Sequence, residues 1–163
     1  LLGRLRKIHA DAATPVAIGV SSVCQGEAAF VDGFAEAQQA LLGTVVLKGE
    51  PTVLAYEDLG AYKYLLRVAL DGGIRDATVD AVTRLAEYDA QRGSQLVATL
   101  EEFLRRHGNI SATSETLFVH PNTLRQRLRR IAELSGLDLR KDDWLMVEIA
   151  VKMVKLDQAL RPD

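Results

Sequence analysis

Hydrophobic and polar residues repeat with a helical period toward the end of the chain. Within residues 121–133, Leu124, Leu128 and Ile131 recur at i, i+4 and i+7, which is the spacing of one apolar stripe on a helix. The residues on the opposite face recur at i, i+3, i+4 and i+7, and they are Asn122, Arg125, Gln126 and Arg129. The pattern therefore predicts a helix with one buried apolar face and one exposed face of amides and arginines.

A second, shorter helix and a tight apolar turn come before this one. Pro121 suits the first helical position, where its missing N–H is no loss and its fixed φ fits the helix. Either Val119 or His120 ends the turn, and either Asn109 or Ser111 caps the short helix before it. Two helices joined in this way have the layout of a helix-turn-helix.

Positive charge is concentrated on the second helix. The whole chain has a net charge of −2, so composition alone does not indicate a nucleic-acid-binding protein. Residues 120–132, however, contain four arginines and no aspartate or glutamate. A local basic surface of this kind is the electrostatic signature of a DNA-binding element.

The side chains on this helix suit both bases and phosphates of DNA. Asn, Gln and Arg make bidentate contacts with base edges in the major groove, and the candidate base-reading residues are Asn122, Arg125, Gln126 and Arg129. The flanking candidates for phosphate contact are Thr123, Arg127 and Arg130. His120, at the turn, suits a DNA-backbone or capping role. The alternative is an ordinary solvated basic helix.

The stretch from Leu96 to Leu156 resembles the C-terminal helix-turn-helix domain of the PucR/CdaR family of bacterial transcription regulators. The residues that carry this resemblance are Leu100, Phe103, Leu104 and residues 108–109, 111–113, 117–120, 122–125, 127–131 and 135–139. The resemblance implies a sequence-specific DNA-binding regulator with double-stranded DNA as its partner. It also implies activation in response to a small metabolite that is sensed upstream of this region.

Three positions depart from related patterns. Family members often have a basic residue in place of Pro121 and an aromatic residue in place of Gln126, so the base preference is not carried over. The more general helix-turn-helix of the Fis type usually has glycine in place of Phe118, which implies a modified turn here.

The N-terminal part predicts helices alternating with strands. We expect helices over 1–10, 27–48 and 62–70 and strands over 15–22 and 52–56, with 45–47 as an alternative short strand. The apolar stripe of the second helix is Phe30, Phe34, Ala37, Leu41 and Val45. Residues 17–22, 34–41 and 56–60 resemble the C-terminal half of the GGDEF-like domain that precedes the helix-turn-helix in the same regulators.

These patterns predict an α+β chain that is mostly helical. We expect a partial GGDEF-like segment over 1–70, a linker helix over 71–93 that begins after an Asp71-Gly72-Gly73 turn, and a helix-turn-helix domain over 94–163. Ser94 is the expected cap of the helix that follows the linker, and Asp142 or Asp143 caps the last helix. That last helix is apolar on more than one face, so its second face covers either this chain or a second subunit.

Catalysis, metals and cofactors have little support in the sequence. Enzymes that make cyclic di-GMP use a GGDEF signature, but Gly72-Gly73 lacks its acidic and aromatic residues. Three scattered histidines and one cysteine form no metal-ligand spacing. We therefore expect no enzyme activity, no cofactor and no metal.

The remaining expectations concern context. The single Cys24 fits a reducing cytoplasm, and no apolar run is long enough to cross a membrane. The chain begins at Leu1 rather than Met, so we expect a fragment of a longer protein with the effector sensor outside it. The two short strands have exposed edges, which suggests pairing across a homodimer.

Overall fold

The computed structural model describes residues 1–48, 50–70 and 72–160, with the side chain of residue 48 left out. The chain divides into two compact units, Leu1–Gly73 with Lys155–Asp163, and Ile74–Val154. Asp71 of the predicted turn and residues 161–163 of the predicted last domain lie outside the described residues. The described residues are mostly helical with one small sheet, so the α+β prediction is confirmed.

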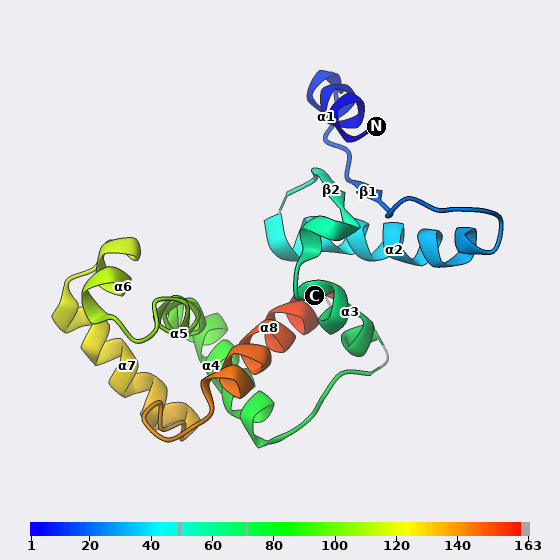
Figure 1. Cartoon of the computed structure of the whole chain (residues 1–163). Helices are drawn as coiled ribbons and strands as arrows, with labels where there is room; N and C mark the ends of the chain where they lie inside the picture. Colours follow the sequence, from blue (N-terminus) through cyan, green and yellow to red (C-terminus); the bar gives the residue numbers. More distant parts are fainter. Residues whose placement is uncertain (49, 71, 161–163) are drawn as a thin grey trace. The chain divides into compact units, whose positions relative to one another are not determined.

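The first unit is a small α/β arrangement built around two parallel strands (Figure 1). Strands β1 and β2 pair in the register Ile18↔Val53, Gly19↔Leu54 and Val20↔Ala55. Helix α2 (Ala29–Gly43) continues into a π-helical turn over Thr44–Lys48. Residues 45–47 therefore extend this helix and do not form the alternative strand. The elements are α1 (Leu2–Asp11), β1 (Ile18–Val20), α2 (Ala29–Gly43), β2 (Val53–Ala55), a 3-10 turn (Tyr56–Leu59) and α3 (Tyr62–Leu70).

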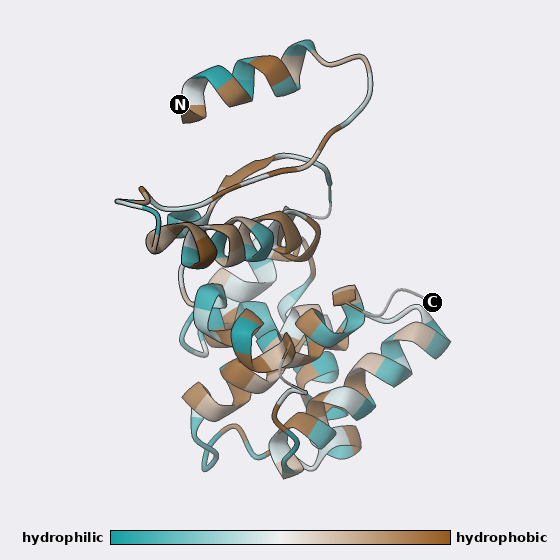
Figure 2. Ribbon diagram, turned by 90° about the vertical axis from the view of Figure 1, so that its right-hand side faces the viewer, coloured by the Kyte–Doolittle hydropathy of each residue, from teal (hydrophilic) through white to brown (hydrophobic). Residues whose placement is uncertain are grey.

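Small residues hold α2 against the sheet. A Cβ at Gly19 of β1 would lie 2.1 Å from the carbonyl oxygen of Ala37, so strand and helix backbones are in direct contact. The buried residues of α2 are Gly33, Ala40 and Gly43. This close approach leaves no room for large side chains between helix and sheet. Many residues along α2 are apolar, drawn brown in Figure 2, and the side chains of Phe30 and Phe34 are exposed.

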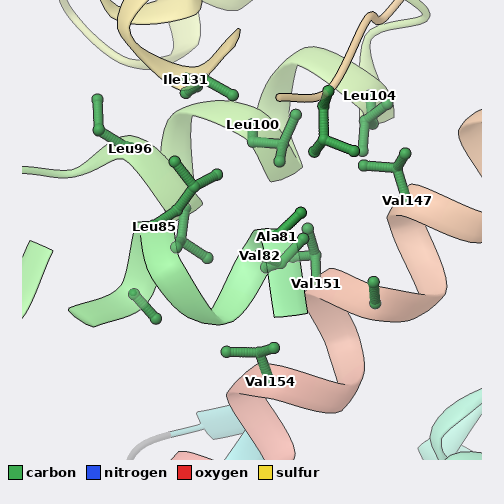
Figure 3. Packing of buried hydrophobic residues seen from close by; sticks show 14 residues of the cluster. Ala81, Val82, Leu85, Leu96, Leu100, Leu104, Ile131, Val147, Val151 and Val154 are labelled. Carbon is green, nitrogen blue, oxygen red and sulfur yellow. The ribbon is translucent and has the colours of Figure 1, made fainter. Parts of the chain in front are cut away.

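The second unit is entirely helical. It contains α4 (Ala77–Arg92), α5 (Leu96–Arg105), α6 (Ile110–Thr116), α7 (Pro121–Ser135) and most of α8 (Trp144–Leu160). Its core joins side chains of α4, α5, α7 and α8, among them Val82, Leu85, Leu100, Ile131 and Val151, each with no exposed surface (Figure 3). The helix predicted as a linker therefore contributes directly to this core.

Asp89, near the end of α4, caps the start of α5. Its carboxylate accepts hydrogen bonds from the backbone N–H groups of Leu96 at 2.8 Å and Val97 at 2.9 Å, and from the Ser94 hydroxyl. These N–H groups have no partner inside their own helix. The expectation that Ser94 caps α5 is wrong, because the Ser94 hydroxyl donates a hydrogen bond to the Asp89 carboxylate instead. Gly93, with φ of +62°, reverses the chain after α4 and brings Ser94 next to Asp89.

Replacing Asp89 by alanine should lower the free energy of unfolding of the second unit by about 1–2 kcal/mol, because two helix N–H groups lose their acceptor. Trp144 is the single tryptophan of the chain and lies in this unit, so its fluorescence in a urea titration reports on the unit. Glu87→Ala, at an exposed position of the same helix, is the matched control. Equal stability of the two variants would contradict the capping role.

Candidate nucleic-acid interface

The short helix α6 begins where Asn109 caps it. The side-chain oxygen of Asn109 accepts a hydrogen bond from the N–H of Ala112 at 3.0 Å, whereas the Ser111 hydroxyl bonds to Glu115. Of the two capping candidates in the sequence, Asn109 and Ser111, Asn109 is therefore the one that caps α6. Thr113 and Ser114 are buried, and α6 packs against both α5 and α7. Small side chains such as these permit helices to cross closely.

The turn between α6 and α7 is tight and strained. Leu117 and Val119 are half-buried on either side of Phe118, whose side chain is 95% exposed. Phe118 has φ of +53°, in the left-handed region that is costly for a residue with a Cβ. The N–H of Val119 donates to the Ser114 carbonyl at 3.0 Å. This bond closes the turn and holds Phe118 outward.

His120 caps the second helix of the motif. Its Nδ1 accepts a hydrogen bond from the N–H of Asn122 at 3.2 Å, and Pro121 occupies the first helical position. The turn thus ends at His120 rather than at Val119. His120 therefore has the capping role of the two that its position suggested. The residue is exposed, and its contact with the DNA backbone stays a prediction.

The rotation of α7 about its own axis is fixed by its apolar stripe. Leu124 and Ile131 have no exposed surface, and Leu128 is half-buried. The residues left exposed away from this stripe include Asn122, Thr123, Arg125, Gln126, Arg129 and Arg130. Within this face the Asn122 side-chain oxygen accepts a hydrogen bond from Arg125 at 3.0 Å. The structure therefore brings the candidate base-reading residues together on one open helix face.

Arg127 and Arg130 differ from these residues because each has a partner on another helix. Arg127 is half-buried and donates to the Thr99 hydroxyl on α5 at 3.2 Å. The guanidinium of Arg130 lies 5.1 Å from the ring centre of Tyr88 and forms an ion pair with Glu133 at 3.2 Å. The interaction with Tyr88, and after it the hydrogen bond to Glu133, raises the pKa of Arg130 above its usual value. Both arginines thus help to fix α7 against its neighbours.

A buried carboxylate connects α5 to the motif. Glu102 is 7% exposed and binds the guanidinium groups of Arg105 and Arg106, the second at 2.8 Å. Burial raises the pKa of Glu102, but the hydrogen bonds from Arg106 and Arg105 outweigh it and hold the pKa below its usual value. Arg106 also donates to the Thr116 hydroxyl of α6 at 3.1 Å. The i, i+3 and i, i+4 spacing of these charges is the sequence signal that could have identified the network.

Comparison with known proteins agrees with this geometry. Residues 96–153 match the PucR C-terminal helix-turn-helix domain, and this range runs from the first residue of α5 into α8. The C-terminal part of the chain is a PucR-type helix-turn-helix domain. The resemblance to the PucR/CdaR family is therefore confirmed for this part. The match does not include residues 1–95, so the GGDEF-like resemblance stays a prediction.

Proteins similar to this chain include three bacterial regulators. It is 31% identical over 106 residues to the DNA-binding transcriptional activator AdeR of Bacillus subtilis, covering 64% of the chain and 25% of the relative. It is 28% identical over 151 residues to the Purine catabolism regulatory protein of the same species, covering 92% of the chain and 28% of the relative. It is 38% identical over 101 residues to the Carbohydrate diacid regulator of Escherichia coli, covering 60% of the chain and 25% of the relative.

The chain thus spans roughly a quarter of the length of these relatives. No solved structure matches it. None of the helices among the described residues is long and apolar enough to span a bilayer. The same residues contain no group of three or more His, Cys, Asp or Glu side chains arranged to hold a metal ion.

Replacing Phe118 by glycine should stabilise the second unit by up to about 1 kcal/mol, because glycine adopts the left-handed conformation without strain. The ring makes little packing contact that could be lost, since it is almost fully exposed. Phe118→Ala is the matched control: it also removes the ring but keeps the Cβ, and it should gain nothing. Thermal unfolding followed by Trp144 fluorescence measures both, and equal midpoints for the two variants would contradict strain at this position.

Proposed function

We propose that this chain is the DNA-binding part of a transcription regulator, and that α7 enters the major groove of its operator. The observation that supports this most strongly is the exposed polar face of α7, which is held outward by the burial of Leu124 and Ile131. A helix of this kind, following a shorter helix and a tight turn, is the groove-binding arrangement of helix-turn-helix proteins. The names of the relatives also support regulation of transcription.

The proposed roles follow the geometry of the face. Asn122, Arg125, Gln126 and Arg129 contact base edges, because their planar amide and guanidinium groups match the donor and acceptor pattern of the major groove. Thr123 and His120 contact the DNA backbone beside the N-terminus of α7. Arg127 and Arg130 remain predicted phosphate contacts, and each would exchange or share its present intramolecular partner on binding.

A homodimer completes the proposal. One helix makes few base contacts, so a specific genomic site requires two half-sites about one helical turn apart, read by two copies. Two of the relatives are named as activators, AdeR and the Proline-responsive transcriptional activator PutR, which supports activation in response to a metabolite sensed outside this region. A regulator of this kind acts in the bacterial cytoplasm, where the DNA is.

The alternative is a module that binds an effector or dimerises, with its helix-turn-helix in contact with protein. A pocket of the second unit favours it. Aromatic and aliphatic side chains line the pocket, among them Phe103, Leu128 and Trp144, and Arg129 lies at the same pocket. A mobility-shift assay with the promoter fragment beside the gene, repeated over a salt titration, separates the two functions. Specific retardation supports DNA binding, and no retardation at low salt supports the alternative.

Replacing Arg125 or Gln126 by alanine should cost about 1–3 kcal/mol in binding to the specific site and should relax sequence preference at the contacted base pairs. Fluorescence anisotropy with the promoter fragment and with a scrambled duplex of equal length measures both affinities. Arg140→Ala, an exposed arginine outside α7, controls for the loss of one positive charge. Equal losses on the specific and the scrambled duplex would mean that the residue contacts phosphate instead.

Replacing Arg127 by alanine should weaken binding to all duplexes alike and reduce the slope of log affinity against log salt by about one, as expected for one lost phosphate contact. Thr99→Val is the matched control, because it removes the partner hydroxyl that Arg127 binds but keeps the guanidinium. The control should leave the salt slope unchanged. If Arg127→Ala also leaves the slope unchanged, Arg127 has only the structural role described above.

A further inference from the structure

A pocket of about 660 Å³ opens on the surface of the second unit. Its lining comes from the end of α5 and the residues after it, from the second half of α7, and from the connection between α7 and the first residue of α8. The whole pocket therefore belongs to one unit. Small-molecule sites have volumes of about 300–1,000 Å³ and are mainly apolar with a few polar groups, so this volume is that of a small-molecule site.

The more buried part of the pocket is aromatic. Phe103 is buried and Trp144 half-buried, and their ring centres lie 5.9 Å apart. The indole N–H of Trp144 donates to the Leu139 carbonyl at 2.7 Å, which fixes the ring. A Cβ at Gly108 would lie 2.7 Å from the same ring, so the ring lies here only because this residue is glycine. The apolar wall is thus already formed, and the one polar atom of Trp144 already has its partner.

The outer part of the pocket is cationic. His107, Arg129 and Arg140 line it and are exposed. Within the part of the chain that the structure describes, none of these three side chains forms a hydrogen bond or an ion pair. By contrast Arg106, next to His107, binds Glu102 at 2.8 Å. The two guanidinium groups at the pocket are therefore available to a ligand.

The acidic side chain at the pocket already has partners. Among the described residues that line it, Asp138 is the one carboxylate. It accepts a hydrogen bond from the backbone N–H of Arg140 at 3.1 Å and forms an ion pair with Lys141 at 3.5 Å. Because Lys141 offsets the charge of Asp138, the guanidinium groups of Arg129 and Arg140 give the pocket an excess of positive charge. An anionic group is the complementary ligand.

We propose that this pocket binds a small organic anion, a carboxylate with an aromatic or branched aliphatic body. The body lies against Phe103 and Trp144, and the carboxylate accepts hydrogen bonds from the guanidinium groups, whose planar fork matches it. A DNA phosphate or an inorganic anion would leave the aromatic wall in contact with water. A protein partner would need about 20–30 residues on each side, which is far more than this pocket supplies.

Arg129 connects the pocket to the proposed DNA-binding face. It lines the pocket and also lies on the exposed side of α7 that is proposed to read bases. One guanidinium cannot pair with a carboxylate and a base edge at the same time, so the anion and the operator compete for Arg129. Each then lowers the affinity for the other by the same factor. The anion site stands on the pocket alone, whereas the competition rests on the proposed function.

The fluorescence of Trp144 tests the anion site, because Trp144 is the single tryptophan of the chain and lines the pocket. The whole chain is titrated with phenylacetate, phenylpropionate and isocaproate, and each should change the emission and saturate at millimolar concentrations or below. The neutral amides of the same shape should bind about tenfold more weakly or worse, because they lack the charge. Acetate should also bind more weakly, because it lacks the apolar body. Carboxylates that leave the emission unchanged, or amides that bind equally well, overturn the proposal.

Arg129→Gln and Arg140→Gln should each weaken phenylpropionate binding by roughly fivefold or more and leave binding of its amide unchanged. Arg92→Gln is the matched control, since it removes an exposed arginine of the same unit that does not line the pocket, and it should change neither affinity. Far-UV circular dichroism verifies the fold of all three variants. Wild-type affinity for phenylpropionate in both pocket variants overturns the assignment of the carboxylate to these guanidinium groups.

Fluorescence anisotropy with the labelled promoter duplex tests the competition. Saturating phenylpropionate should lower the affinity of the wild-type chain for the duplex by about fivefold or more, whereas acetate at the same concentration gives only the effect of ionic strength. Unchanged DNA affinity while Trp144 reports a filled pocket overturns the competition but supports the anion site. A chain that binds phenylpropionate and no DNA overturns the proposed function, and with it the competition, but supports the anion site. A chain that binds DNA and no carboxylate overturns the anion site alone.

Discussion

The burial of Leu124 and Ile131 determines what the second unit presents to solvent. Ile131 belongs to the core shared with α4, α5 and α8, and Leu124 has no exposed surface. Once both are buried, the side of α7 with Asn122, Arg125, Gln126 and Arg129 must face outward. Polar contacts at both ends strengthen the same orientation: His120 caps the beginning of α7, and Arg84 of α4 donates to the Ser135 carbonyl at its end at 2.9 Å. The proposed DNA contacts are thus a consequence of core packing rather than of the arginines themselves.

The two units use α-helices in opposite ways. In the second unit large aliphatic side chains fill the space between helices and polar side chains face outward. In the first unit the helix α2 lies so close to β1 that only small residues fit between them, and its large apolar side chains are left on the surface. One unit therefore presents a polar helix face to solvent, and the other leaves large apolar side chains of a helix exposed.

The sequence predicted the second unit better than the first, for physical reasons. The helical period of Leu124, Leu128 and Ile131 identified the buried face of α7, and Pro121 and Asn109 marked helix starts, because capping preferences are local. Long-range partners were not visible: nothing adjacent in sequence shows that Arg127 binds Thr99. The stripe of α2 was recognised as apolar, but its exposure depends on glycines that act only once the strand is packed beside them.

The central claim is that the outward face of α7, and no other surface of the second unit, receives DNA. Backbone amide resonances recorded by NMR during titration with the promoter duplex test it most directly. We expect the largest shifts at His120, Asn122, Thr123, Arg125, Gln126 and Arg129, with α4 and the buried side of α7 little changed. Shifts that leave this face unchanged and concentrate at the pocket around Phe103 and Trp144 or along α8 would contradict the claim.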